Sequence, residues 1–394
     1  MSAVDSDPAV FASQPIAQLL IKVATRCNID CSYCYWFRDA SVYDKPKLMS
    51  AEVLQQLLLR IEEHLVRHDR LVDFPVVLHG GEPLLWGVEN FNHFAEACAA
   101  ITSRTGCEIP IAVTTNGVLI DDQWLDCFES HRISVAISLD GPAHIHDIHR
   151  RTFQGTGTHA AVERAARRLV SRDICVSALS VCNPAFPPQQ YAEFFAACGV
   201  THYDIMIPDA TVDEKPPSIA SFYNGLFDLW FEANRSRPTV EIRIISDMVT
   251  ALLGNDSPTE GVGYNPVELC TVMTDGSVEA HDVLRIAGDG FTTTSFNIFE
   301  HALDEVRNEP GWKAARDASI NLSAKCRQCK FMNACGGGYL PHRFSKHNGY
   351  DNPSVDCDDL DAMFENMQSV LERHVYVSKP GGERLNLRDA LASG

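Results

Sequence analysis

The first half of the chain alternates short apolar runs, rich in β-branched residues, with longer segments of helical periodicity. The clearest helical segment begins after Ser50, a good N-cap residue, and places Val53, Leu57 and Ile61 on one face. Further helical segments are expected at 90–103, 121–130, 158–172 and 188–198. Six runs have the length and composition of buried strands, and they lie near 17–24, 75–79, 109–114, 133–139, 174–181 and 203–207.

Six strand-then-helix units predict a parallel sheet, because right-handed crossovers return each strand to the side of the previous one. Curling such a sheet gives a partial (β/α)6 barrel of the TIM type, and this α/β fold is our interpretation. An open sheet of the Rossmann kind is the alternative.

The composition changes after the sixth strand. The segment Pro208–Pro217 is polar and rich in proline, which is typical of a linker. A helix, a short strand at 239–245 and a glycine-containing loop are expected beyond it. The predicted units are a lead-in at 1–15, a barrel at 16–208, a bridging region at 209–265, a second domain at 266–375 and a tail at 376–394.

The surface is expected to be acidic. The 394 residues include 33 basic and 52 acidic side chains, which give a formal net charge of −19. This balance argues against nucleic acid or an anionic membrane as a partner. No apolar run approaches the roughly 20 residues of a membrane span. Asp5 and Asp7 stand where a secretory signal places positive charge, so we expect a cytoplasmic protein.

Three of the 14 cysteines lie in one loop directly after the first predicted strand. Cys27, Cys31 and Cys34 have the spacing C-x3-C-x2-C. Three thiolates so placed can hold three irons of a 4Fe-4S cube and leave the fourth iron open to a ligand. Structural zinc is the alternative, but zinc prefers four closed ligands, and the nearest candidate, His79, is far along the chain.

Glycine-rich and polar motifs follow the next predicted strands, where sites gather in barrels of this type. Taken singly, each also fits an ordinary turn, because Asn-Gly and Asp-Gly are common turn formers. The motifs are Gly80-Gly81-Glu82-Pro83 after the second strand, Thr115-Asn116-Gly117 after the third, and Ser138-Leu139-Asp140-Gly141-Pro142 at the end of the fourth.

A second cysteine cluster lies near the C-terminus. Its four thiolates suit zinc as well as a 4Fe-4S cube, so spacing alone leaves both open. The cluster consists of Cys326, Cys329, Cys335 and Cys357. Six scattered cysteines are interpreted as buried apolar residues without function, and they are Cys98, Cys107, Cys127, Cys175, Cys182 and Cys198.

Taken together and in order, these motifs resemble the radical S-adenosylmethionine (SAM) superfamily, and the C-terminal cysteines resemble the SPASM domain of its peptide-modifying members. The resemblance implies SAM and two 4Fe-4S clusters as cofactors. One cluster would bind SAM at Cys27, Cys31 and Cys34, and an auxiliary one would lie at Cys326, Cys329, Cys335 and Cys357. The implied SAM-binding residues are Gly80, Gly81 and Glu82 at the amino group, Ser138 and Arg150 at the carboxylate, Asp140 beside the ribose, and Asn116.

The SPASM pattern is incomplete. A full domain holds a further auxiliary cluster, whose cysteine positions correspond here to Cys270, His281 and Tyr339. One cysteine cannot hold a cube, so two clusters in total are expected. Asp282 follows His281 and matches an aspartate that takes a proton from the substrate in sulfatase-maturing members. We therefore predict Asp282 as the catalytic residue, and a surface aspartate at a hairpin end is the alternative.

Motifs such as His79-Gly80-Gly81-Glu82-Pro83 and Asp351-Asn352-Pro353-Ser354 look most like those of cyclophane-forming maturases of ribosomally made peptides. The resemblance implies removal of a β-hydrogen from a precursor peptide, bond formation to an aromatic ring, and a reductant such as flavodoxin or ferredoxin. Formylglycine formation in a sulfatase and thioether formation are alternatives on the same scaffold. A non-catalytic iron–sulfur or zinc protein is another, and a nicotinamide oxidoreductase lacks its G-x-G-x-x-G fingerprint after the first strand.

Overall fold

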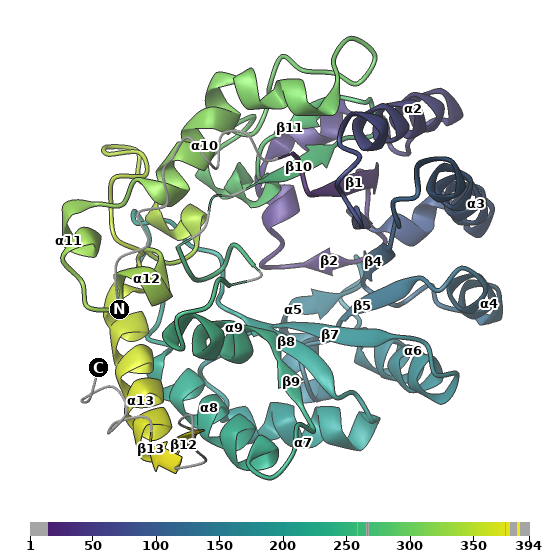
Figure 1. Ribbon diagram of the computed structural model, residues 1–394. Helices are drawn as coiled ribbons and strands as arrows, with labels where there is room; N and C mark the ends of the chain where they lie inside the picture. Colours follow the sequence, from purple (N-terminus) through teal and green to yellow (C-terminus); the bar gives the residue numbers. More distant parts are fainter. Residues whose placement is uncertain are drawn as a thin grey trace.

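The computed structural model describes residues 15–257, 259–264, 266, 268–374, 376–378 and 384–386. Nearly all of the predicted lead-in and most of the predicted tail lie outside these residues. A nine-stranded sheet, in the order β11-β10-β1-β3-β4-β5-β7-β8-β9, curls so that helices cover its outer face (Figure 1). Neighbouring strands are parallel except for the antiparallel pair of β10 and β11.

The six central strands are the ones that the apolar runs predict. They stand in the sheet in their order along the chain, as in a partial barrel. A Rossmann sheet would reverse this order at a switch point, so that alternative is wrong. The strands are β1 (Gln18–Ala24), β3 (Val76–Gly80), β4 (Ile111–Thr115), β5 (Ser134–Ser138), β7 (Val176–Val181) and β8 (His202–Met206).

The predicted helices also form. Ser50 Oγ accepts a hydrogen bond from the Val53 backbone N–H at 3.2 Å, which confirms the N-cap, and Leu57 and Ile61 are buried in the main core. The barrel helices are α2 (Ala51–Arg67), α3 (Val88–Thr105), α4 (Asp122–Ser130), α6 (His159–Ser171), α7 (Pro188–Cys198) and α8 (Ala220–Asn234). Shorter elements at the strand ends are β2 (Asp30–Cys31), η1 (Tyr35–Arg38), η2 (Ala40–Asp44), η3 (Pro83–Trp86), α5 (Ala143–His149) and β6 (Arg150–Arg151).

Strands from beyond residue 208 extend both edges of the sheet. At one edge β10 (Leu269–Val272) pairs in parallel with β1, and β11 (Val278–Glu279) follows it. At the other edge β9 (Glu241–Ile242) pairs with β8. The strand expected at 239–245 is thus only two residues long, because α9 (Arg243–Leu252) begins there. The Asp204 carboxylate accepts from the Ile244 N–H at 3.2 Å and satisfies the first turn of that helix.

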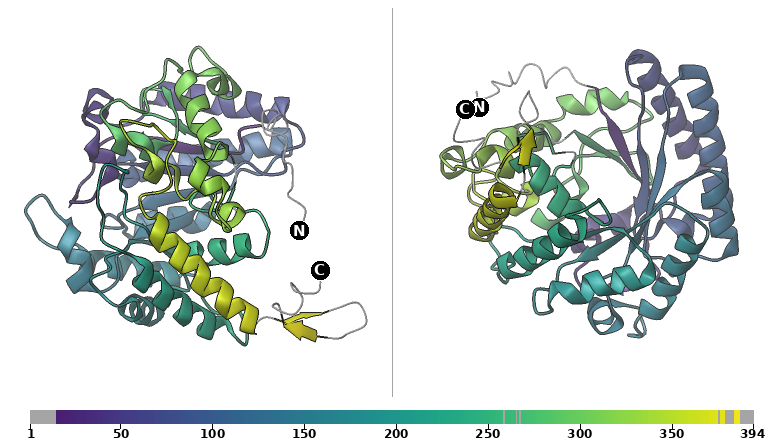
Figure 2. Two further views of the ribbon diagram at one scale, coloured as in Figure 1. Left: turned by 90° about the vertical axis from the view of Figure 1, so that its left-hand side faces the viewer. Right: turned by 60° about the horizontal axis from the view of Figure 1, so that its bottom comes forward.

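The C-terminal region, residues 266–374, fills the side of the barrel between these two edges (Figure 1). Its long helix α13 lies along α8, as both views in Figure 2 show. No helix in the described part of the chain is long and apolar enough to cross a membrane. The boundary at residue 208 stays a prediction. The remaining elements are η4 (Asp282–Ala287), η5 (Leu303–Asn308), α10 (Pro310–Ile320), α11 (Ala324–Arg327), α12 (Met332–Cys335), η6 (Leu340–Arg343), α13 (Cys357–His374), β12 (Tyr376–Ser378) and β13 (Arg384–Asn386).

Candidate active site

A cavity of about 520 Å³ lies inside the barrel at the carboxyl ends of its strands, and its size is typical of small-molecule sites. It brings together all of the residues predicted for the first cluster and its ligand except Glu82 and Asp140. The lining residues in this set are Cys27, Cys31, Cys34, Gly80, Gly81, Asn116, Ser138 and Arg150.

The two glycines let the end of β3 approach the start of the cysteine loop. Gly80 has a φ of 148°, and a Cβ there would lie 2.0 Å from the carbonyl oxygen of Ala24. At Gly81 a Cβ would lie 2.4 Å from the carbonyl oxygen of Arg26. The Gly81 and Glu82 N–H groups donate to these same two oxygens at 2.8 and 2.9 Å. Only glycine fits this approach, so the pair positions the segment that enters the cysteine loop.

Burial shapes the chemistry of the cysteine loop. It raises the pKa of Cys27 to about 12 and that of Cys31 to about 11. Thiolates are the form that binds the irons of a cluster, so cluster binding would displace the protons of these thiols. Asn116 Nδ2 donates to Asn28 Oδ1 at 2.7 Å and lies 3.5 Å from Cys27 Sγ. The loop after β4 therefore braces the loop after β1.

Glu82 faces the protein and not the cavity. Its Oε1 accepts from the Leu84 N–H at 2.9 Å and the Thr115 hydroxyl at 2.7 Å, and its Oε2 accepts from the Asn116 N–H at 2.8 Å. Burial nevertheless raises the pKa of Glu82 to about 7. The side chain thus ties the loop after β3 to the loop after β4.

Asp140 likewise points into the protein, where it holds the Arg150 side chain in place. Its carboxylate accepts from Arg150 Nε at 3.0 Å, from the Val181 N–H at 3.1 Å and from the Tyr33 hydroxyl. Burial lowers the pKa of Arg150, but Asp140 and Tyr33 outweigh it and raise the pKa above the usual value. Arg150 also stands opposite Cys31 in the short ladder of β2 and β6. The result is a permanently charged guanidinium on the cavity wall, suited to a carboxylate ligand.

Asp282 lies on the wall of the same cavity, at the start of η4, and is only 2% exposed. Its Oδ2 is 2.5 Å from Lys22 Nζ and accepts from the Tyr35 hydroxyl at 2.5 Å. Burial alone would raise the pKa of Asp282, but Lys22 and the neighbouring His281 and His79 together outweigh it and hold the pKa well below its usual range. Asp282 is therefore a buried carboxylate and not a surface residue.

Lys22 is a site residue that the sequence analysis missed. It is completely buried, and its Nζ also lies 3.2 Å from His79 Nδ1. Burial and the Lys22 charge together lower the pKa of His79 to about 3, so His79 is neutral. The sequence does contain a signal for Lys22, because it is a charged residue within the apolar run of β1. It lies on the same face of the strand as Gln18 and Leu20, which line the cavity.

The three positions of the incomplete auxiliary site do not meet. Cys270 is packed in the main core, whereas its neighbour Leu269 faces the cavity. His281 and Tyr339 line the cavity, with their ring centroids 5.5 Å apart. Strand alternation in β10 thus turns the only cysteine of this set away from the other two positions.

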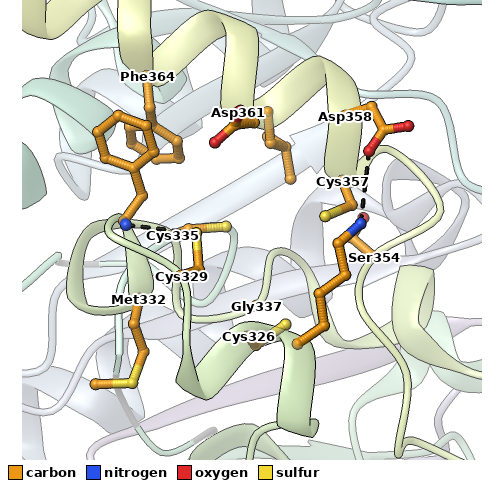
Figure 3. A pocket seen from close by; sticks show the side chains of 13 residues that line it. Cys326, Cys329, Met332, Cys335, Gly337, Ser354, Cys357, Asp358, Asp361 and Phe364 are labelled. Atoms are coloured by element: carbon orange, nitrogen blue, oxygen red, sulfur yellow. Dashed lines mark hydrogen bonds and ion pairs between the residues drawn. The ribbon is translucent and has the colours of Figure 1, made fainter.

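The other cysteine cluster surrounds a separate cavity of about 260 Å³. Figure 3 shows the sulfur atoms of Cys326, Cys329, Cys335 and Cys357 around a common space beside Phe364. Among the described residues, His64, His68 and Asp304 have ligand atoms within 4.8 Å of one another, close enough for a single ion. The cysteines of the two sets do not meet this distance. Four thiols around one space are enough to hold a 4Fe-4S cube.

The sequence and the fold match known proteins. Residues 21–204 match the family model of the radical SAM superfamily. The chain is 27% identical over 371 residues to the cysteine-type anaerobic sulfatase-maturating enzyme of Clostridium perfringens (strain 13 / Type A), covering 89% of this chain and 96% of that enzyme. It is 24% identical over 374 residues to the serine-type enzyme of Bacteroides thetaiotaomicron, covering 86% and 85%.

The fold is also similar to that of solved structures. Native anSMEcpe with bound AdoMet aligns with a TM-score of 0.78 at 25% identity, over 90% of this chain and 98% of that chain. SuiB of Streptococcus suis shares the fold, with a TM-score of 0.61 at 15% identity over 86% and 76%. With the cysteine-lined cavity at the strand ends, these matches identify residues 21–204 as a radical SAM domain.

Proposed function

We propose that the protein is a maturase that modifies a residue of a peptide or protein substrate, with SAM and two 4Fe-4S clusters as cofactors. The observation that carries this proposal is the barrel cavity, whose wall bears the three cysteines of the C-x3-C-x2-C loop, Arg150 and Asp282. The similarity to native anSMEcpe with bound AdoMet and Kp18Cys peptide, with a TM-score of 0.79 at 26% identity, supports a peptide substrate.

The cofactor residues follow from the lining of the cavity. Cys27, Cys31 and Cys34 would hold the SAM-binding cluster, and Arg150 and Ser138 would meet the carboxylate of SAM. The backbone of Gly80 and Gly81 and the Asn116 side chain would line its amino end. Glu82 and Asp140 act indirectly, by holding Asn116 and Arg150 in place. When bound, the cluster and SAM supply the one-electron chemistry that removes a hydrogen atom from the substrate.

Asp282 is proposed to accept the proton that the substrate loses. The Lys22 ammonium keeps Asp282 ionised, so its carboxylate carries no proton of its own, and Tyr35 fixes the orientation of the same oxygen. Lys22 thus acts through Asp282 as a positioning residue. The cysteines around the second cavity would hold the auxiliary cluster, which would supply an electron acceptor, and a flavodoxin or ferredoxin is the proposed reductant.

The proposed product is a carbon–carbon crosslink between a substrate β-carbon and an aromatic ring. Its formation removes one hydrogen atom from the β-carbon and one proton and one electron from the ring. A second candidate is oxidation of a cysteine or serine to formylglycine. The similarity to cysteine-type and serine-type sulfatase-maturating enzymes along most of the chain favours this candidate.

One experiment separates the two products. The anaerobically reconstituted enzyme is incubated with SAM, a reductant and two peptides, one with an aromatic crosslinking motif and one with a sulfatase-type cysteine motif. A product two hydrogens lighter that resists aminooxy reagents supports the crosslink. An aldehyde captured by those reagents overturns it in favour of formylglycine. If neither peptide changes while SAM is still cleaved, neither proposed substrate motif is correct.

A further inference from the structure

A cluster of metal-ligating side chains lies outside the barrel, on the face opposite the active-site cavity. His64 and His68 are one turn apart at the end of α2, and Asp304 comes from η5 in the C-terminal region. The cluster contacts Ile16, just before β1, whereas the cysteine loop follows the other end of that strand. The seven residues of β1 span roughly 23 Å, so the two sites are separate.

The three side chains present their ligand atoms to one another. His68 Nε2 lies 2.7 Å from Asp304 Oδ2, and His64 Nδ1 lies 3.3 Å from the same oxygen. All three ligand atoms lie within 4.8 Å of one another, as a single bound ion requires.

The hydrogen bonding of His64 points to a cation. Its Nε2 lies 2.9 Å from the carbonyl oxygen of Ile16, which can only accept, so Nε2 carries the hydrogen. In a neutral imidazole, Nδ1 then carries a lone pair and can only accept a hydrogen bond. Here Nδ1 faces a carboxylate oxygen of Asp304. Two acceptors cannot face each other without a positive charge between them. A bound cation between the two atoms supplies that charge, with His64 Nδ1 and the Asp304 carboxylate as two of its ligands.

A metal ion meets this requirement with groups that are already in place. A histidine that binds a metal commonly donates its other ring N–H to a backbone carbonyl, as His64 does to Ile16. Asp304 Oδ1 is buried and has no hydrogen-bond partner among the described residues, so it is open to a ligand. Arg67 is the competing cation, with Nη1 3.5 Å from Asp304 Oδ2, but its side chain is 53% exposed and free to turn away.

We propose that His64, His68 and Asp304 form a divalent-metal site, with zinc as the preferred ion. Two imidazoles and a carboxylate suit zinc, and the partial exposure of His68 and Asp304 leaves room for water as the fourth ligand. The ion would join the first barrel helix to the C-terminal region far from the chemistry. Its role is therefore structural, and it stabilises the folded chain by binding it.

The test uses the reconstituted holoprotein. After incubation with zinc chloride and gel filtration, zinc and iron are counted together. One zinc per chain is expected in the wild type and none in His68→Gln or Asp304→Asn, with unchanged iron. His93→Gln, a change at an exposed histidine of α3, is the matched control and should keep its zinc. Zinc should also raise the melting temperature of the wild type and of His93→Gln, but not that of His68→Gln.

X-ray absorption at the zinc edge decides where the ion sits. Nitrogen and oxygen ligands at about 2.0–2.1 Å support the site, whereas sulfur at about 2.3 Å places the zinc on the cysteines and overturns it. Equal zinc uptake by the wild type and His68→Gln, or no uptake by the wild type, also overturns the proposal. His64, His68 and Asp304 would then only join α2 to η5 by hydrogen bonds.

Discussion

Lys22 Nζ lies 2.5 Å from Asp282 Oδ2, and this ion pair joins β1 of the radical SAM domain to η4 of the C-terminal region, behind the wall of the active-site cavity that Asp282 lines. Both side chains are almost completely removed from water. Removing one partner of such a pair leaves an uncompensated buried charge, which typically destabilises a protein by about 3–5 kcal/mol. The pair therefore links the assembly of the site to the stability of the fold.

Lys22→Met should destabilise the protein by about 3–5 kcal/mol at neutral pH. Asp282 has a lowered pKa in the folded state, so its stabilisation is present above the unfolded pKa and is lost as pH falls through the folded pKa. Without Lys22 the pKa of Asp282 rises, so product formation should fail at a higher pH than in the wild type. Anaerobic unfolding and a pH–rate profile measure the two effects.

The double variant Lys22→Met/Asp282→Asn is the control for that experiment. It removes both charges, so it should recover part of the stability that Lys22→Met loses. If the two single changes and the double change are additive, the two groups do not interact in the folded protein.

Asp282→Asn should separate radical generation from product formation. Asparagine keeps the shape of aspartate but leaves the Lys22 charge without its partner, so the variant should be less stable than the wild type. At temperatures where it is folded, SAM cleavage should persist while product falls by about 10²–10⁴-fold. Deuterium at the substrate β-carbon should still reach 5′-deoxyadenosine, which serves as the internal control. Product at the wild-type rate would show that another group or water accepts the proton.

The iron content tests the number of clusters. Two four-iron clusters correspond to about eight irons per chain. Replacing Cys27, Cys31 and Cys34 by alanine should halve the iron and abolish SAM cleavage. Replacing Cys326, Cys329, Cys335 and Cys357 should also halve the iron but leave the SAM-binding cluster in place. About twelve irons in the wild type would mean that non-cysteine ligands around His281 complete a third cluster.

The strands and the cavity lining could be predicted because both depend on local patterns. Apolar runs set the strands, and in a parallel barrel the residues that follow each strand meet at one end, as Cys27 and Asn116 do. The Lys22–Asp282 pair could not be predicted in the same way. Its partners lie 260 positions apart, and their contact depends on β10 pairing with β1, which no local pattern reveals.

The positions of Glu82 and Asp140 illustrate a second limit. Their motifs show that these carboxylates belong to the site, but not which way they face. That direction depends on donors from other strands, such as the Asn116 N–H for Glu82 and the Val181 N–H for Asp140. A buried carboxylate turns toward the donors that satisfy it, so its orientation is a property of the assembled barrel.

Arg150 gives the sharpest test of the SAM pocket. Arg150→Ala should weaken SAM binding by roughly 10- to 100-fold, the value of a charge-assisted hydrogen bond, without removing iron. Arg150→Lys keeps a positive charge but loses the planar fork, so its affinity should lie between those of the wild type and Arg150→Ala. Asp140→Asn should have a smaller effect, because Asp140 acts only by holding Arg150. Equilibrium dialysis gives the affinity of each reconstituted variant for SAM, and an iron count checks that its clusters are intact. Unchanged affinity in Arg150→Ala would mean that SAM binds elsewhere in the cavity.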